Sequence, residues 1–160
     1  MNVFIIDDER LARQELREML ANYKQVNILA EFDNSEEAIE AINSQKPDLI
    51  FLDIHMPGKD GFALLQSLNY VPNVIFVTAY DEYALKAFEV SALDHLVKPV
   101  EQARLKAAIE KIELLLEANP SNSNNDLLDE NDQVFVKDGE KCWFVQLKDI
   151  RLFESEGNYV

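Results

Sequence analysis

Short apolar runs alternate with longer amphipathic segments over most of this chain. Continuous short apolar runs are typical of strands buried on both faces of a parallel sheet. The sequence predicts five such strands, at Asn2–Ile6, Val26–Phe32, Asp48–Asp53, Asn73–Thr78 and Ala92–Val97. Apolar residues that recur every three or four positions predict five helices, at Leu11–Tyr23, Glu36–Asn43, Gly61–Leu68, Asp81–Glu89 and Glu101–Ala118. Asn34 and Glu37 predict a capping box at the start of the second helix.

Strict alternation of strands and helices favours right-handed crossover connections and therefore a parallel sheet. The predicted fold class is α/β, with a doubly wound, five-stranded parallel sheet over residues 1–118. In sheets of this kind, ligands bind beyond the carboxyl ends of the strands. Functional residues are therefore expected where the predicted strands end.

A second region follows the last predicted helix. Residues 119–132 consist mostly of Asn, Ser, Asp and Pro, a composition typical of a flexible linker. Residues 133–160 form a short β-rich segment, in which Asp138-Gly139 is a strong signal for a hairpin turn. Its expected strands are Gln133–Val136, Lys141–Val145 and Arg151–Ser155. So small a fragment is not expected to close a hydrophobic core.

Length and charge exclude several classes of protein. The chain has 160 residues, 48% of them hydrophobic, but no apolar run near the roughly 18 residues that a bilayer span needs. Its beginning lacks the basic start and cleavage site of a signal peptide, so we expect a cytoplasmic protein without a membrane partner. The net charge of −15 repels phosphate backbones, so we expect this chain to bind nucleic acid poorly.

Cysteine and histidine are too few to support a disulfide or a zinc site. Cys142 is the only cysteine, and the only histidines, His55 and His95, are widely separated. We therefore expect no internal disulfide and no zinc cluster.

Acidic, hydroxyl and amino side chains lie where the predicted strands end. Asp7 and Asp8 follow the first strand, Asp53 ends the third, Thr78 ends the fourth and Lys98 follows the fifth. Because parallel strands share one carboxyl edge, these side chains are expected to converge. Carboxylates that lie close together repel one another unless a cation neutralises them, and their hard oxygen atoms suit Mg²⁺. The sequence therefore predicts a Mg²⁺ site at this edge.

The same residues fit phosphoryl transfer onto a carboxylate. Lys98 offers a point charge and Thr78 a hydroxyl for the oxygen atoms of a phosphoryl group, which Mg²⁺ also bridges. Asp53 is the better candidate for the acceptor because it stands alone at its strand end, opposite Asp7 and Asp8, and an aspartate can act as a covalent nucleophile. Asp7 and Asp8 are then expected to hold the metal.

These motifs, in this order and at these spacings, resemble the receiver domain of two-component response regulators. The resemblance covers residues 1 to about 120. It is carried by Asp7-Asp8, by Asp53 with Met56-Pro57, and by Asp60-Gly61, Thr78-Ala79 and Lys98-Pro99. It implies the flavodoxin-like strand order 2-1-3-4-5 and the function of a phosphoacceptor switch rather than an enzyme.

The resemblance also implies the roles of the acidic residues. Asp53 would receive a phosphoryl group from a sensor histidine kinase. Mg²⁺ would be coordinated by Asp8, by Asp53 and by the backbone carbonyl of His55, and Asp7 would act through a metal-bound water.

Further roles follow for the residues after the fourth and fifth strands. By resemblance, Thr78, followed by Ala79, would move towards the phosphate, Lys98 would pair with it, and the peptide bond before Pro99 would be cis. The family usually has Tyr or Phe three positions before the lysine, as a ring that turns inward on activation. Here that position holds His95, a smaller ring that can carry charge. The fourth helix, fifth strand and fifth helix would form the output surface, with a homodimer as one possible outcome of phosphorylation.

The end of the chain resembles the first strands of a LytTR-type DNA-binding domain, in which a stretch such as Glu154 to Tyr159 is typical. Residues 133–160 would be only the beginning of such a domain, without its DNA-contacting parts. We therefore expect DNA to be bound only through a complete C-terminal domain.

Two alternatives use similar chemistry or topology. A Mg²⁺-dependent phosphohydrolase also forms an aspartyl-phosphate, but many such enzymes carry a second acid two residues after the nucleophile, where this chain has His55. A flavin-binding domain would want a Ser/Thr/Gly-rich loop after the first strand, where Asp7, Asp8 and Glu9 would repel phosphate. The switch is the favoured interpretation.

Overall fold

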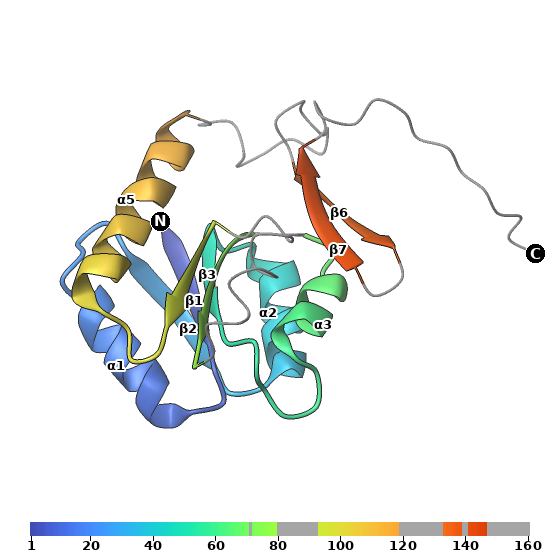
Figure 1. Cartoon of the computed structure of the whole chain (residues 1–160), viewed down its shortest axis with the longest axis horizontal. Helices are drawn as coiled ribbons and strands as arrows, with labels where there is room; N and C mark the ends of the chain where they lie inside the picture. Colours follow the sequence, from blue (N-terminus) through green and yellow to red (C-terminus); the bar gives the residue numbers. More distant parts are fainter. Residues whose placement is uncertain (71, 80–92, 119–132, 139–140, 147–160) are drawn as a thin grey trace, which may run out of the picture.

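A five-stranded parallel sheet forms the centre of the molecule (Figure 1). The computed structural model describes residues 1–70, 72–79, 93–118, 133–138 and 141–146. The strands are β1 (Asn2–Ile6), β2 (Asn27–Phe32), β3 (Leu49–Leu52), β4 (Asn73–Thr78) and β5 (Asp94–Val97). They pair in parallel in the order β2-β1-β3-β4-β5, which confirms the predicted fold class and strand order.

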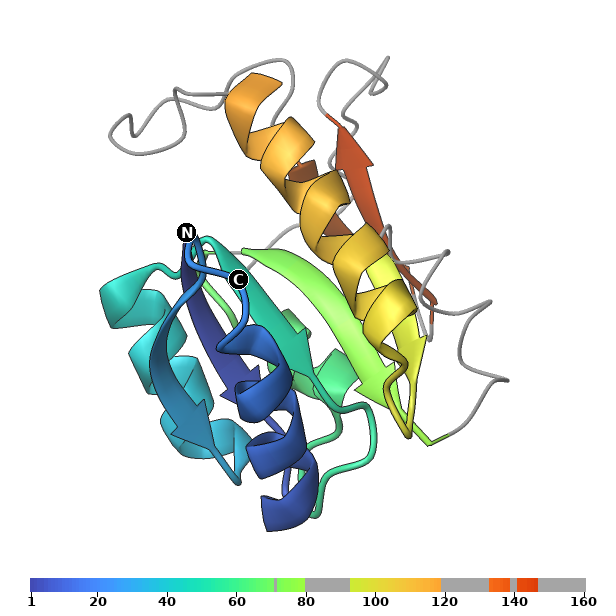
Figure 2. The same cartoon turned by 90° about the vertical axis from the view of Figure 1, so that its left-hand side faces the viewer.

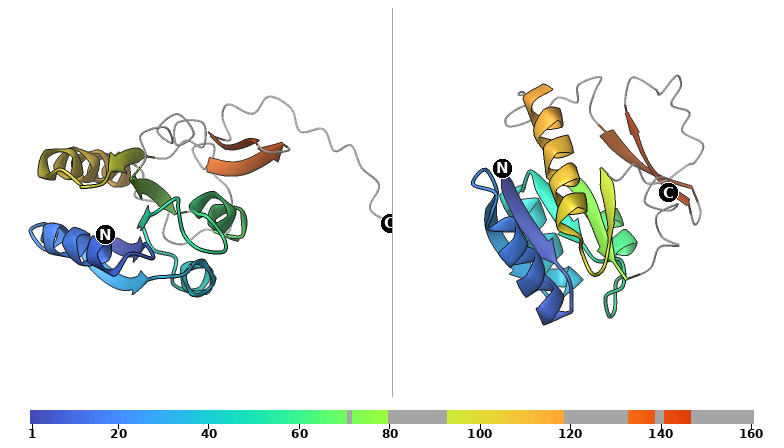
Figure 3. Two further views of the ribbon diagram at one scale, coloured as in Figure 1. Left: turned by 60° about the horizontal axis from the view of Figure 1, so that its bottom comes forward. Right: turned by 60° about the vertical axis from the view of Figure 1, so that its left-hand side comes forward.

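Helices cover both faces of this sheet, as Figures 1 and 3 show. The helices are α1 (Arg10–Leu20), α2 (Ser35–Gln45), α3 (Gly61–Gln66) and α5 (Gln102–Ala118). Figure 2 turns towards the viewer the face that α1 and α5 cover, and α2 and α3 lie on the opposite face.

The side chains of the central strands alternate between these two layers. Phe4 and Ile6 of β1 pack in the cluster with α2 and α3, whereas Val3 and Ile5 pack in the cluster with α1 and α5. All four side chains are at most 1% exposed. A fully buried side chain of this size contributes roughly 1.5–3 kcal/mol, so the continuous apolar runs are explained by burial on both faces.

Local capping fixes where the helices begin and end. The Asn34 side chain accepts a hydrogen bond from the Glu37 N–H at the start of α2, which is one half of the predicted capping box. The helix ends at Gln45, and the C-cap residue Lys46 has a left-handed φ of 46°. The carboxylate of Asp60 caps α3 by accepting from the Ala63 N–H at 2.7 Å.

The predicted bounds of two helices were too long. We predicted that the first helix would run to Tyr23 and the third to Leu68, but α1 ends at Leu20 and α3 at Gln66. Tyr23 and Leu68 still pack against the core after their helices have ended. The Tyr23 N–H donates to the Leu20 carbonyl, and the Leu68 N–H donates to the Leu65 carbonyl. The spacing of apolar residues therefore overstated the helical length.

The segment after residue 132 contains an antiparallel hairpin. Strands β6 (Gln133–Asp138) and β7 (Lys141–Gln146) pair with Asp138 opposite Lys141, so the predicted hairpin is confirmed with slightly longer strands. The predicted helix Asp81–Glu89, the first residue of the predicted strand Ala92–Val97, the linker 119–132 and the strand Arg151–Ser155 lie outside the described residues. Among the described residues, no helix combines the length and the apolar character that a membrane span requires.

Candidate functional site

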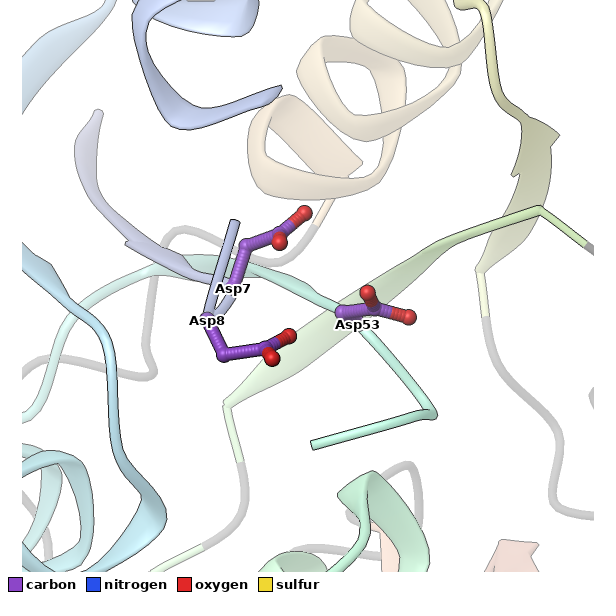
Figure 4. Close-up of side chains that lie close together, drawn as sticks. All are labelled: Asp7, Asp8 and Asp53. Atoms are coloured by element: carbon purple, nitrogen blue, oxygen red, sulfur yellow. The ribbon is translucent and has the colours of Figure 1, made fainter. Parts of the chain in front are cut away.

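Three carboxylates meet at the carboxyl edge of the sheet (Figure 4). Asp7 and Asp8 follow β1, and Asp53 follows β3. Because β1 and β3 are neighbours in the sheet, one oxygen of each carboxylate lies within 4.8 Å of the others. Asp7 and Asp53 are each only 4% exposed, and Asp8 is half-buried.

An ammonium group bridges two of these carboxylates. Lys98 follows β5, and its Nζ lies 2.8 Å from Oδ2 of Asp7 and 2.8 Å from Oδ2 of Asp53. Glu9 also contacts this ammonium group, at 3.2 Å from its Oε1. The Lys98–Pro99 peptide bond is cis, as expected. One lysine therefore neutralises part of the negative charge that the acids bring together.

Burial and mutual contact change the proton affinities of these groups. Burial raises the pKa of the Asp7 carboxyl, and hydrogen bonds from Lys98 and from the Glu9 N–H offset only part of this effect. Burial alone would lower the pKa of Lys98, but hydrogen bonds to Asp53 and Asp7 raise it above its ordinary value. Lys98 therefore carries its full charge at neutral pH.

The backbone around Asp53 is held firmly. Its N–H donates to the Ile6 carbonyl at 2.8 Å, and its Oδ1 accepts from the His55 N–H at 3.1 Å. Gly61 approaches so closely that a Cβ there would lie 2.6 Å from the Asp53 carbonyl oxygen. The motif Asp60-Gly61 thus supplies a helix cap and the close contact behind the candidate acceptor.

The remaining predicted site residues lie on β4, on β5 and in the loops. Thr78 ends β4 fully buried, Ala79 follows it exposed, and His55 is an exposed loop residue. His95 lies on β5 opposite Phe76 of β4, and its carbonyl accepts a hydrogen bond from Arg104 at 3.2 Å. Of the predicted site residues, the structure therefore places the side chains of Asp7, Asp8, Asp53 and Lys98 close together at the carboxyl edge of the sheet.

Sequence reasoning did not assign a role at the site to two contacting residues. Glu9 reaches Lys98, and Arg13 of α1 donates from Nη1 to the carbonyl oxygen atoms of Asp7 and Asp8, at 2.5 Å and 3.2 Å. No motif signalled the Arg13 contact, because it depends on where the first turn of α1 lies relative to the end of β1.

The donor set fits a small, hard cation. Three carboxylates within 4.8 Å offer only oxygen ligands, and Asp8 carries the most accessible of them. Oxygen-rich sites of this kind suit Mg²⁺, which binds through one or two carboxylates and keeps several waters.

Comparisons with known proteins agree with this fold. The chain belongs to the response regulator receiver domain family, whose model matches residues 3–110. Sensory transduction protein LytT of Enterococcus faecalis is 47% identical over 114 residues, covering 69% of this chain and 47% of that protein. The chain thus spans about half the length of this relative. Transcriptional regulatory protein BtsR of Escherichia coli is 36% identical over 168 residues, covering 100% of this chain and 69% of BtsR.

Solved structures show the same fold. The response regulatory domain of protein mrkE from Klebsiella pneumoniae superposes with a TM-score of 0.67 at 34% identity, covering 74% of this chain and 99% of that one. The REC domain of AraT, a response regulator from Geobacillus stearothermophilus, gives a TM-score of 0.66 at 32% identity, covering 75% of this chain and 98% of that one. These matches support a response regulator and not the phosphohydrolase alternative. The match to BtsR along the whole chain is consistent with a LytTR-type segment after the receiver domain.

Proposed function

We propose that Asp53 is the phosphoacceptor of this receiver domain and that a sensor histidine kinase is its donor. The observation that carries the proposal is the position of the Asp53 carboxylate, which lies at a strand end beside the acid pair and 2.8 Å from the Lys98 ammonium group. Asp8, Asp53 and the carbonyl of His55 would hold Mg²⁺, and Asp7 would act through a water molecule. Bound there, Mg²⁺ would neutralise charge on the phosphoryl oxygen atoms.

The transfer exchanges one bond to phosphorus for another. An oxygen of the Asp53 carboxylate forms the new P–O bond while the bond from phosphorus to the donor's histidine nitrogen breaks. The electron pair of the broken bond stays with that nitrogen. The chain's own contribution is to hold the Asp53 carboxylate in place, with the His55 N–H on one oxygen and the charged Lys98 ammonium group on the other.

Lys98 and Thr78 would then bind the transferred group. The Lys98 ammonium contacts Asp53 before transfer, so it can follow the phosphoryl oxygen atoms with little movement. Thr78 is in register with Val97, next to Lys98, so its hydroxyl lies on the neighbouring strand end. We propose that these two residues, with Ala79 and His95, transmit the change to β5 and α5.

The output of the switch would be transcription. This proposal rests on the resemblance of residues 133–160 to a LytTR-type domain and on the relatedness to a transcriptional regulatory protein. DNA would be bound through a complete C-terminal domain, and phosphorylation would favour a homodimer through the surface that includes β5 and α5. Beryllofluoride, which mimics the phosphoryl group, tests this route: we expect backbone NMR shifts in residues 94–111. Shifts confined to the acidic site would show that His95 does not act as a switch.

Intact-mass measurement tests the phosphoacceptor directly. The chain is incubated with Mg²⁺ and acetyl phosphate, and we expect one added phosphoryl group. Asp53→Asn keeps the shape but removes the nucleophile, so it should gain none. Asp60→Asn is the matched control, because it removes a nearby carboxylate and retains a side chain that can cap α3. Phosphorylation of the Asp53→Asn protein would contradict the assignment.

A further inference from the structure

One partly buried cation holds the backbone of the acid pair. Nη1 of Arg13 donates to the carbonyl oxygen of Asp7 at 2.5 Å and to that of Asp8 at 3.2 Å. The Arg13 side chain is only 14% exposed. These bonds go to the peptide groups and not to the carboxylates, which remain available for a metal ion.

The reach of Arg13 follows from helix geometry. Side chains of an α-helix lean towards its N-terminus, so a long side chain in the first turn extends over the preceding loop. Arg13 donates its own N–H to the Glu9 carbonyl in the first turn of α1. The Glu9 side chain makes no capping hydrogen bond to this helix. Arg13 therefore supplies a side-chain contact from the first turn of α1 to the loop that carries Asp7 and Asp8.

A second residue limits the movement of the guanidinium group. Glu31 of β2 lies 3.9 Å from Nε of Arg13 through its Oε2, and 3.1 Å from Nη1 of Arg17 through its Oε1. The Asp7 N–H also donates to the Phe32 carbonyl of β2 at 3.0 Å. The peptide groups on both sides of Asp7 are therefore fixed to neighbouring elements, one directly by β2 and one through Arg13.

We propose that Arg13 is a positioning residue for the metal site, which holds Asp7 and Asp8 in the orientation that Mg²⁺ requires. Groups that orient metal ligands typically change metal affinity by about 10–100-fold when they are removed. The proposal rests on the proposed Mg²⁺ site, and it assigns Arg13 no contact with the metal or the phosphoryl group.

A matched pair of variants tests this role. Arg13→Met removes the donors and keeps much of the bulk. Arg17→Met removes one positive charge and one Glu31 partner from the same helix, but Arg17 is more exposed and its guanidinium group contacts Glu31 on β2. Mg²⁺ is titrated into each protein without phosphodonor, and binding is followed by backbone amide shifts of residues 7, 8 and 53. Phosphorylation by acetyl phosphate is then measured as a function of Mg²⁺ concentration.

We expect Arg13→Met to weaken Mg²⁺ binding at least tenfold and to raise the half-saturating Mg²⁺ for phosphorylation by the same factor. The rate at saturating Mg²⁺ should stay within about twofold of wild type, because the metal, once bound, restores the ligand geometry. Arg17→Met should leave the Mg²⁺ affinity and the half-saturating Mg²⁺ concentration within about twofold of wild type. A general loss of structure would lower the saturating rate instead. Equal titration curves for the two variants, or tighter binding in Arg13→Met, would overturn the proposal.

Arg13→Lys keeps the test decisive if Arg13→Met does not fold. Lysine retains the positive charge but lacks the planar set of N–H donors of the guanidinium group. The Mg²⁺ affinity of Arg13→Lys should therefore fall below that of Arg17→Met. An affinity equal to that of Arg17→Met would overturn the role of Arg13. A wild-type chain that binds no Mg²⁺ would instead refute the metal site of the proposed function, so the two failures are distinguishable.

Discussion

Replacing Gly61 by alanine should disturb stability and phosphoryl transfer together. A Cβ at this position would lie 2.6 Å from the Asp53 carbonyl oxygen and 3.1 Å from the Ile54 Cα. Ordinary contact begins at 3.4 Å, so the first of these distances is 3.4 − 2.6 = 0.8 Å too short. Both neighbours are backbone atoms, so the strain cannot be relieved by turning a side chain.

The size of the effect follows from two opposing contributions. Overpacking in a buried site costs roughly 1–3 kcal/mol, and replacing glycine in a helix returns up to about 1 kcal/mol. Gly61→Ala should therefore lower the free energy of unfolding by about 1–2 kcal/mol. Because the displaced backbone belongs to Asp53, we also expect phosphorylation by acetyl phosphate to slow by about tenfold, since misplacement by an ångström can cost about 100-fold.

Gly58→Ala is the control for this experiment. A Cβ at Gly58 meets nothing within 4 Å, but the φ of +86° is unfavourable for alanine. We expect a loss of about 1 kcal/mol, because strain of about 1–2 kcal/mol is only partly offset by the lower entropy of the unfolded chain. Its phosphorylation rate should be unchanged. Urea unfolding followed by circular dichroism measures both stabilities. A Gly61→Ala protein as stable and as rapidly phosphorylated as wild type would refute the reasoning.

Three further outcomes follow from the site and the helix caps. In the metal-free chain, burial raises the pKa of Asp7, so the charged form of Asp7 destabilises the fold. Asp7→Asn should therefore raise the free energy of unfolding at pH 7, and this gain in stability should shrink as the pH falls through that pKa. A gain that grows at low pH would contradict the assignment. Millimolar Mg²⁺ should raise the melting temperature of the wild type and leave that of Asp8→Ala unchanged, whereas an equal rise in both would remove Asp8 from the site. Asn34→Ala should cost about 1 kcal/mol in urea unfolding through loss of the bond to the Glu37 N–H, without slowing phosphorylation; an unchanged unfolding midpoint would show that this cap contributes nothing.

The main features of the sheet could be predicted from the sequence because burial on both faces leaves continuous apolar runs. The same logic placed Asp7, Asp53 and Lys98 at one edge, since the ends of parallel strands coincide. Helix ends were less predictable: Tyr23 and Leu68 keep packing against the core after their helices stop, so apolar spacing alone cannot mark the last turn.

The supporting contacts of the site could not be predicted for a different reason. The bonds from Arg13 to the Asp7 and Asp8 carbonyls depend on the angle at which α1 leaves β1. The contact of Glu9 with Lys98 joins residues that are 89 positions apart. Neither contact leaves a periodic pattern, because each is fixed by tertiary geometry and not by the burial of a whole element.

Strand β3 has a consequence for how this protein can change during evolution. It has only four residues, and they alternate between the two hydrophobic layers: Ile50 and Leu52 pack on one side, and Leu49 and Phe51 on the other. Asp53 follows directly, without an intervening loop residue. A substitution that repacks either layer therefore moves the proposed acceptor as well. Mutations that adjust stability in this strand cannot be selected independently of signalling, so we expect adaptive changes to accumulate on the helices and in the loops instead.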